Sequence, residues 1–385
     1  MNNKFLIVCN AYPSKEAIYR NGFIHRRVKA YQKKGYEIDV FYLHLNATQQ
    51  EVYKYDGVNV TFGNEIHYQK FLNENKQVYK TFLIHFINPQ MYYPIIETIS
   101  SPKIVVWIHG FEAEAWHRRW FNFLSSTFEL NQIIEKANDY YPNQLEFMNQ
   151  LYKETQYDIT FIHVSKWFKT HIADVDAKFS PLNYEIIPNI VDDSVFNYVP
   201  KERKGKLKIL SIRPFASYKY ANDQTADAIH ILSKKPFFND IEFHIYGEGK
   251  LYPKITESLH QYENVFLHNT FLEQKEIANI HKKFDVFLCP TRLDSQGVSM
   301  CEAMSSGLVV ISSNTTAIPE FVTHNETGLL ADKESPESIA YQIERIYFNE
   351  LLFNKISNQA AVSIREIASE SVVIDKEMKV ILSER

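Results

Sequence analysis

The sequence predicts an α/β protein with two doubly wound domains, each built around a mostly parallel sheet. Its 385 residues exceed what one hydrophobic core usually serves, so two domains are expected. Short apolar runs alternate with amphipathic stretches from end to end, which indicates repeated strand–helix units. Many of the apolar runs are almost continuous, as in parallel strands that helices cover on both faces.

The expected strands fall into two series. Those of the first half are 5–9, 38–43, 58–62, 81–86, 104–109, 159–164 and 185–187. Those of the second half are 207–212, 242–246, 265–268, 285–289 and 308–312. Helices are expected between them, for example over 221–234 and around 339–346, where apolar residues recur on one helical face.

A break in this pattern at 198–206 predicts a linker. A proline, a glycine and a cluster of charged residues interrupt the alternation there. We therefore expect an N-terminal domain over 1–197, a C-terminal domain over 207–365, and a C-terminal helix over 366–385 that could cross back to the first domain. Open parallel sheets bind ligands at the carboxyl ends of their strands, so a ligand cleft is expected between the domains.

Composition narrows the class of protein. With 45% hydrophobic and 23% charged residues, the chain has the make-up of an ordinary globular protein. Its apolar runs are too short to cross a bilayer and its first strand follows no leader, so a cytoplasmic location is expected. A net charge of −4 argues against nucleic-acid binding. The three widely spaced cysteines form no CxxC pair and predict buried, inert thiols rather than a zinc site or disulfides.

The most informative stretch is 291–307, which follows the expected strand 285–289. Gly297 lies at the mouth of a new helix, where a glycine lets the backbone approach a ligand closely. The first N–H groups of that helix, at Val298 and Ser299, have no acceptor within the helix. They favour an anion such as a diphosphate.

Two carboxylates, Asp294 and Glu302, bracket this glycine. Glu302 is placed to accept hydrogen bonds from ribose hydroxyls, as the acidic residue of dinucleotide-binding folds does. A second interpretation is open, because Ser299 and Glu302 also have the spacing of a capping box. In that case Glu302 would only cap its own helix.

Further candidates stand at the ends of other expected strands. Arg213 closes one strand and Lys219 follows shortly after it. A forked guanidinium and a compact ammonium at one strand end suit a pyrophosphate. Gly247 and Gly249 follow another strand, and His109 ends a third. Taken singly, these residues have ordinary interpretations as solvated charges, a turn and a structural histidine.

Taken together, the motifs resemble those of glycosyltransferase family 4, retaining enzymes of the GT-B fold with two Rossmann-like domains. The resemblance covers nearly the whole chain and is strongest over 160–335. Its motifs fall on Gly22, His109, 188–192, Arg213, Lys219, Gly247, Gly249, Asp294, Glu302 and 327–330. Two positions depart from the family: Asp294 stands where glutamate is usual, and Asn21 precedes Gly22 where two glycines are common.

The resemblance implies a hexosyltransferase that moves a sugar from a UDP- or GDP-sugar to a saccharide hydroxyl, with retention at the anomeric carbon. Arg213, Lys219 and the amides of Gly297–Ser299 would stabilise the leaving diphosphate, with Gly22 contributing from the other domain. Asp294 and His109 would contact the donor sugar, and Glu302 the ribose.

Further implications concern the donor base and the reaction itself. Backbone groups near Phe271 would read the base. The acceptor hydroxyl would attack from the face that the diphosphate leaves. With Arg213 and Lys219 present, no metal and no cofactor other than the donor substrate is expected. Asp174 and Asp176, which resemble a metal-binding pair, are expected on a helix surface.

Two other functions use the same scaffold. A nucleotide-sugar epimerase or hydrolase would need no separate acceptor, and fold alone does not exclude it. A non-catalytic nucleotide-sugar-binding protein is the second, since Asp294 departs from the family. A Rossmann dehydrogenase is disfavoured because no GxGxxG follows the first strand.

Two segments bear on the acceptor. Residues 25–34 hold five Lys or Arg with no acidic residue between them, and 116–124 interleave basic with large aromatic residues. Such segments favour an anionic membrane surface. We therefore expect a lipid-linked saccharide acceptor of a bacterial surface polysaccharide or glycoconjugate, with the enzyme peripheral on the inner face of the membrane. The ordinary interpretation is a solvated helix face and a partly buried aromatic cluster.

Overall fold

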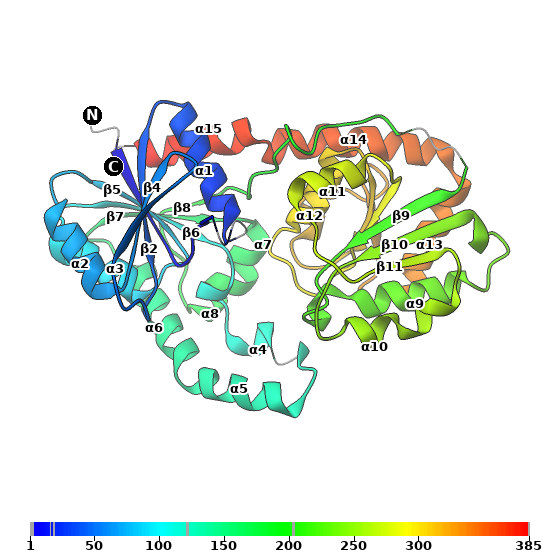
Figure 1. Ribbon diagram of the computed structural model, residues 1–385, viewed down its shortest axis with the longest axis horizontal. Coiled ribbons are helices and arrows are strands. Elements are labelled where there is room, and N and C mark those ends of the chain that lie inside the picture. Colours follow the sequence, from blue (N-terminus) through cyan, green and yellow to red (C-terminus); the bar gives the residue numbers. More distant parts are fainter. Residues whose placement is uncertain (1–3, 16, 18–19, 121–122, 202–204, 384–385) are drawn as a thin grey trace. The chain divides into compact units, whose positions relative to one another are not determined.

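The computed structural model describes residues 4–15, 17, 20–120, 123–201 and 205–383. By their internal contacts these divide into two units. The first unit consists of Met1–Arg118, Ile134–Asn189 and Val373–Arg385, and the second of Arg119–Ile133 and Ile190–Val372. Figure 1 shows each unit as a sheet with helices packed against it. The division falls at Asn189, ahead of the linker expected at 198–206, of which 202–204 lie outside the described residues.

The sheet of the first unit has the strand order β3-β4-β2-β1-β5-β6-β7-β8. Every pairing is parallel except β3 with β4. The strands are β1 Lys4–Cys9, β2 Glu37–Leu43, β3 Glu51–Tyr55, β4 Val58–Gly63, β5 Thr81–His85, β6 Lys103–Ile108, β7 Asp158–His163 and β8 Tyr184–Ile186. The interior strands bury almost every side chain, as continuous apolar runs predict.

Helices cover this sheet, and local signals set several of their starts. They are α1 Gly22–Lys33, α2 Glu65–Glu74, α3 Pro89–Thr98, α4 Trp116–Arg119, α6 Tyr140–Lys153, α7 Lys166–Phe168, α8 Asp174–Asp176 and α15 Glu370–Leu382; α5 Thr127–Asn138 belongs partly to each unit. Asn64 and His67 form a capping box at the start of α2. Asn88 caps α3, whose first residue is Pro89.

The C-terminal helix α15 lies beside α1 in the first unit (Figure 1). Its Glu377 is fully buried and accepts hydrogen bonds from Arg27 Nε at 2.8 Å, Tyr31 Oη at 2.6 Å and Trp107 Nε1 at 2.9 Å. A buried carboxylate is tolerated only when it is paired in this way. The sequence predicted one helix over 366–385. In the structure this segment contains the end of α14, which stops at Ala368, and the whole of α15.

The sheet of the second unit is entirely parallel, in the order β11-β10-β9-β12-β13-β14. Its strands are β9 Leu207–Ile212, β10 Ile241–Tyr246, β11 Val265–His268, β12 Val286–Leu288, β13 Val309–Ser313 and β14 Leu329–Ala331. Its helices are α9 Asn222–Leu232, α10 Tyr252–Thr256, α11 Gln274–His281, α12 Val298–Ser305, α13 Pro336–Phe348 and α14 Glu350–Ala368. Apolar side chains of β9, β10, β12 and β13 form its core with α9, α13 and α14.

The predicted alternation of strands and helices is confirmed, with two strands that the sequence pattern did not indicate. β3 was missed because Glu51, Val52 and Lys54 are exposed at the sheet edge and make no apolar run. β14 is only three residues long. Cys9, Cys289 and Cys301 are buried free thiols, as predicted. Within the described part of the chain, none of the helices is both long and apolar enough to span a bilayer.

Candidate functional site

Arg213 follows β9 and is held by its backbone, whose N–H donates to Tyr246 O at 3.1 Å. Its side chain is 5% exposed. Nη1 lies 3.4 Å from Ser299 Oγ, and Nη2 lies 3.9 Å from Asp294 Oδ2, beyond hydrogen-bond distance. Nε and Nη2 have no hydrogen-bond partner among the described residues. A buried cation with unfilled donors is costly unless an anionic ligand completes it.

Asp294 shapes the turn that enters α12. Its Oδ1 accepts from the N–H of Gln296 at 3.1 Å and of Gly297 at 2.7 Å. Its other oxygen is the one that faces Arg213. The Gly297 amide, expected to bind the diphosphate, is therefore already bonded to Asp294. That expectation is corrected, and by their position in the first turn the N–H groups of Val298 and Ser299 remain as donors for an anion.

Gly297 itself is the N-cap of α12, with φ of 78°. A Cβ there would lie 3.0 Å from Ile318 Cδ1, so both backbone and packing favour glycine. No side-chain cap bond is present at this helix start. The capping-box interpretation of Ser299 and Glu302 is thus wrong. Glu302 is 7% exposed within α12 and stays a candidate for the ribose.

Lys219 lies in a short 3₁₀ turn, Tyr218–Tyr220, which follows the loop after Arg213. Its Nζ lies 4.8 Å from the centre of the Tyr220 ring, and the Arg213 guanidinium lies 5.2 Å from the same ring. The two cations predicted from the sequence are therefore brought together on one aromatic side chain.

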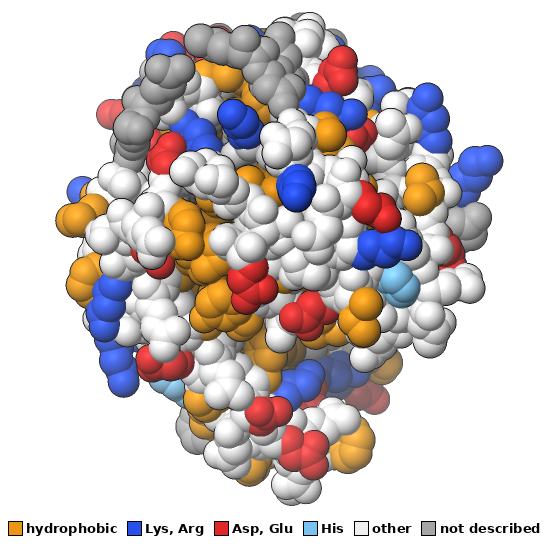
Figure 2. Space-filling model, turned by 90° about the vertical axis from the view of Figure 1, so that its left-hand side faces the viewer, with side chains coloured by type: hydrophobic (Ala, Val, Ile, Leu, Met, Phe, Trp, Pro, Cys, Tyr) orange, Lys and Arg blue, Asp and Glu red, His pale blue; other side chains and the backbone are white. Residues whose placement is uncertain are grey.

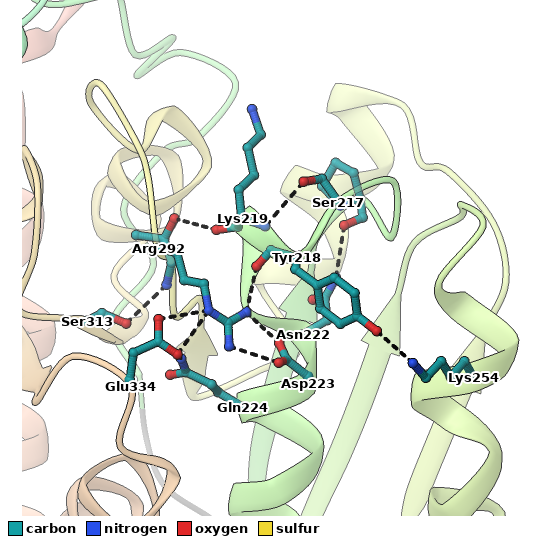
Figure 3. A network of polar contacts seen from close by, with 12 residues as sticks. Ser217, Tyr218, Lys219, Asn222, Asp223, Gln224, Lys254, Arg292, Ser313 and Glu334 are labelled. Atoms are coloured by element: carbon teal, nitrogen blue, oxygen red, sulfur yellow. Dashed lines mark hydrogen bonds and ion pairs between the residues drawn. The ribbon is translucent and has the colours of Figure 1, made fainter. Parts of the chain in front are cut away.

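Arg292 fixes this turn and was not singled out from the sequence. Figure 3 shows its guanidinium between two carboxylates. Its two Nη atoms bond Asp223 at 2.8 Å each, and its Nε bonds Glu334 at 2.8 and 3.0 Å. Nη1 also donates to Tyr218 O at 2.6 Å, and the Arg292 N–H donates to Lys219 O at 2.8 Å. The Lys219 ammonium points away from this network (Figure 3).

The glycines after β10 are required by packing. A Cβ on Gly247 would overlap the carbonyl oxygen of Arg213, and one on Gly249 would overlap the backbone of Phe215. Their φ values are 150° and 145°. The Phe215 N–H donates to Glu248 O at 2.8 Å, which closes the two loops onto each other. Gly247, predicted to bind the donor, thus sets the position of Arg213.

Phe271 lies in the loop after β11 and is 62% exposed. Its carbonyl oxygen accepts from Thr270 Oγ1 at 3.1 Å. The backbone of this loop was predicted to read the donor base. Phe271 is exposed, so a ligand can reach this loop. The base contact stays a prediction.

His109 follows β6 in the first unit. Its Nε2 lies 2.9 Å from Nδ1 of the fully buried His85, and the two rings are stacked with centroids 5.2 Å apart. Burial lowers the pKa of both histidines well below the usual value, and the charge of Arg27 acts in the same direction. A neutral imidazole suits the predicted role of hydrogen-bonding a sugar hydroxyl.

Glu112 holds the loop after His109. One carboxylate oxygen accepts from the His109 N–H at 2.5 Å and the other from the Gly110 N–H at 3.0 Å. Gln144 of α6 donates to Glu112 O at 3.1 Å and to Ile87 O at 2.9 Å. The loop after His109 is therefore tied to α6 and, through Gln144, to the loop after β5.

Gly22 is the first residue of α1. The preceding Asn21 has φ of 49°, and its side-chain amide donates to Asn10 Oδ1 at 3.1 Å and Ala11 O at 3.2 Å. Among the described residues, a Cβ on Gly22 would meet nothing within 4 Å. Packing does not require glycine here, so the space beside it is free for a ligand.

Comparison with known proteins identifies the second unit. Residues 207–349 match the family described as Glycosyl transferases group 1. The match contains Arg213, Lys219, Asp294 and Glu302. Residues 207–349 are a glycosyl transferases group 1 domain. The resemblance stated from the sequence is confirmed for this group 1 domain.

Curated relatives match this chain over only part of their length. The poly(ribitol-phosphate) alpha-N-acetylglucosaminyltransferase of Staphylococcus aureus is 29% identical over 143 residues, which are 36% of this chain and 28% of that protein. The N-acetyl-alpha-D-glucosaminyl L-malate synthase of Bacillus anthracis is 24% identical over 151 residues, 38% of this chain and 39% of that protein. The chain thus spans well under half the length of these relatives.

Solved structures match the whole chain. Sucrose-phosphate synthase from Thermosynechococcus elongatus has a TM-score of 0.73 at 12% identity and covers 98% of both chains. Anabaena HepE in complex with UDP has a TM-score of 0.70 at 12% identity, covering 98% of this chain and 99% of that one. At such low identity these likenesses establish the fold. The predicted GT-B architecture, two parallel-sheet α/β domains of which the group 1 domain is the second, is confirmed.

The basic segment 25–34 is less exposed than its sequence indicates. Arg27 is fully buried against Glu377. Lys29 lies 3.4 Å from Asp56, and Lys34 lies 2.7 Å from Asp375. On the face of the first unit drawn in Figure 2, basic and acidic side chains are interspersed among the described residues. Among the described residues, this segment does not form an extended basic patch.

The second segment, 116–124, is also partly neutralised. Arg118 Nε bonds Asp176 at 2.8–2.9 Å, and residues 121–122 lie outside the described part of the chain. Asp174 in turn pairs with Lys169 at 2.6 Å. Both carboxylates of the pair that resembles a metal motif are thus engaged by the protein's own cations.

Proposed function

We propose that this chain is a metal-independent, retaining glycosyltransferase that uses a nucleotide-sugar donor. The proposal rests on the state of Arg213 at the end of β9. Its guanidinium is buried, and two of its donor atoms have no partner among the described residues. It lies in the group 1 domain and shares the Tyr220 ring with Lys219. A diphosphate supplies the anionic oxygens that these cations lack.

Each residue of the site has a role that follows from its position. Arg213, Lys219 and the first-turn amides of α12 stabilise the charge that develops on the leaving diphosphate. Glu302 accepts from the ribose, and neutral His109 hydrogen-bonds the donor sugar. The acceptor oxygen bonds to the anomeric carbon as the bond to the diphosphate breaks, and the hydroxyl proton passes to the departing phosphate oxygen. Fixed protein cations take the place of a divalent metal in this scheme.

The direct test is a calorimetric screen of UDP- and GDP-sugars, followed by product analysis with the donor that binds. NMR of the product reports the anomeric configuration, which we expect to be retained. Turnover in excess EDTA should equal turnover without it. Inversion, or loss of activity on chelation that magnesium restores, would contradict the mechanism. Release of free sugar without transfer would instead indicate a hydrolase.

The acceptor in this proposal is a saccharide of a surface polysaccharide or glycoconjugate, carried on a lipid at the inner membrane face. Its support is the aromatic and basic composition of 116–124, in which Arg118 is paired with Asp176. The segment 25–34 adds little support, because Arg27, Lys29 and Lys34 are buried or paired. Co-sedimentation with anionic vesicles at low and high salt tests the membrane contact. A protein that ignores such vesicles at low salt uses an acceptor away from the membrane.

A further inference from the structure

The first unit has a hollow of about 630 Å³ at the carboxyl edge of its sheet. Tyr12 stands beyond the end of β1, Tyr42 near the end of β2, and Phe62 near the end of β4; all three line the hollow. We call it the β1–β4 hollow. Parallel sheets bind ligands at this edge, and the volume lies in the range of small-molecule sites. Neither His109 nor Gly22 lines it.

Aromatic rings form much of its wall and are held in place by the protein. Tyr42 and Phe62 contact each other with centroids 4.9 Å apart. The Tyr53 hydroxyl donates to Pro13 O at 3.1 Å. The Tyr12 hydroxyl lies 2.7 Å from His25 Nδ1. Fixed aromatic faces suit the C–H faces of a sugar ring, because they offer apolar area with little loss of side-chain freedom on binding.

The Tyr12 contact continues to a carboxylate. His25 Nε2 lies 3.2 Å from Asp56 Oδ2. If Nε2–H donates to Asp56, Nδ1 is left as the acceptor and the Tyr12 hydroxyl is its donor. The ring of Tyr12 is fully buried, so this chain of bonds fixes the floor of the hollow.

Among the described residues, three cations and one carboxylate line the hollow. Lys15, Arg20 and Lys54 are exposed and make no ion pair among the described residues. Arg20 Nη1 donates to the Tyr42 hydroxyl at 3.4 Å. Glu51 is the carboxylate, and it accepts from Gln49 Nε2 at 2.9 Å. The described lining residues therefore carry a net charge of about +2 on a chain whose net charge is −4, and they favour an anion.

We propose that the β1–β4 hollow binds an anionic saccharide, a sugar that bears a phosphate or a carboxylate, as the acceptor of the transfer. The inference rests on the proposed glycosyltransferase function. The sugar ring packs on the aromatic wall, and Lys15, Arg20 and Lys54 bind the anionic group. A free hydroxyl of this sugar forms the new bond to the anomeric carbon, its proton leaves with the diphosphate, and the anionic group itself does not react.

Binding is tested first without any donor, by NMR titration with glucose 6-phosphate, glucuronate and glucose. We expect the two anions to bind at least about tenfold more tightly than glucose, with an advantage that falls as salt rises. The triple substitution K15Q/R20Q/K54Q should remove this advantage. The matched control K70Q/K76Q/K80Q removes three exposed lysines elsewhere in the first unit and should keep it. Equal binding of glucose and the anions overturns the inference.

A second variant tests the same site in case the triple variant does not fold. Glu51→Gln removes the carboxylate found among the described lining residues and should tighten binding of glucose 6-phosphate severalfold. Glucose binding should not change. If Glu51→Gln weakens or leaves unchanged the binding of glucose 6-phosphate, the hollow is not an anion site.

Transfer assays then test the acceptor role. Phosphorylated and neutral forms of one saccharide are compared, each free in solution and on a lipid carrier, which separates the two sources of the anion. We expect the phosphorylated form to be preferred at least about tenfold in kcat/KM, and K15Q/R20Q/K54Q to abolish the preference while nucleotide affinity stays unchanged. Preference for the neutral form with normal donor binding overturns this inference alone. Failure to bind any nucleotide sugar overturns the proposed function, and the titrations still decide the anion site.

Discussion

Gly247 packs against the carbonyl oxygen of Arg213 so closely that a Cβ at position 247 would overlap it. The loop after β10 thus fixes the end of β9, where the candidate phosphate-binding guanidinium stands. We predict that Gly247→Ala destabilises the protein by about 1–3 kcal/mol, because the backbone there has φ of 150° and must shift. Donor affinity should fall with it, because Arg213 moves. Denaturant unfolding and calorimetry measure the two effects.

Gly22→Ala is the control for this prediction. No described residue lies within 4 Å of a Cβ on Gly22, so the free energy of unfolding should change by less than about 0.5 kcal/mol. If both alanine variants unfold at the same denaturant concentration, the close packing of Gly247 does not matter to stability.

Arg292 supports the Lys219 turn through Asp223, Glu334 and Tyr218 O. We predict that Arg292→Ala costs about 1–2 kcal/mol of stability, a value kept low because both carboxylates are partly exposed. Donor affinity should also fall, since the turn loses its anchor. Arg292→Lys should restore little, because an ammonium cannot bond both carboxylates in the same fork geometry.

The control for Arg292 is Lys235→Ala, which removes an exposed ion pair with Glu344 in the same unit. We expect it to change stability by less than about 0.5 kcal/mol. Equal effects of Lys235→Ala and Arg292→Ala on donor affinity would show that the turn does not depend on Arg292.

Buried neutral histidines predict how stability depends on pH. Burial lowers the pKa of His85 and His109 well below normal, and that of His163 and His281 to about 3. Unfolding lets each histidine regain a pKa of about 6.5, so the unfolded state binds more protons below that pH. Stability is therefore complete above about pH 6.5 and is lost as pH falls below it, at up to about 1.4 kcal/mol per pH unit for each histidine.

Denaturant unfolding at pH 7, 6 and 5 measures this loss. His163→Phe should reduce the slope between pH 6 and 5, because one histidine that must be charged on unfolding is gone. A slope of zero in the wild type would mean that these histidines are not held neutral by burial.

Asp294 has two separable roles in the structure. Its Oδ1 holds the N–H groups of Gln296 and Gly297, and its Oδ2 faces Arg213. Asp294→Asn keeps an acceptor for the turn and removes the charge, so stability should hold while turnover falls. Asp294→Ala should lose about 1 kcal/mol of stability as well, the usual net contribution of a hydrogen bond of this kind. Unfolding curves and turnover with saturating donor distinguish the two. Equal stability of the two variants would contradict the role in the turn.

The sequence predicted the fold well because buried parallel strands leave near-continuous apolar runs, as in β1, β6 and β9. It also placed Arg213 and Lys219 near each other, since both follow one strand end. It did not predict Arg292, His85 or Glu112. Their roles depend on partners distant in the chain, such as Glu334 for Arg292 and Gln144 for Glu112, and no local pattern marks such pairs.

Two interpretations from the sequence changed for physical reasons. The spacing of Ser299 and Glu302 is that of a capping box, but Asp294 already accepts from the Gly297 N–H and Ser299 Oγ faces Arg213. From the sequence, Arg27 was interpreted as a surface charge. It is instead buried by α15, a segment some 350 residues away, and a distant covering segment leaves no mark on the local pattern.

We propose that Arg213 binds the diphosphate of a nucleotide sugar, and the donor affinity of Arg213 variants tests this role most directly. Calorimetry with the UDP- or GDP-sugar that binds the wild type should show a loss of about 1.5–3 kcal/mol in Arg213→Ala, roughly ten- to a hundredfold in Kd. Arg213→Lys should recover part of it, and Lys235→Ala should match the wild type. Wild-type donor affinity in Arg213→Ala would contradict this role of Arg213.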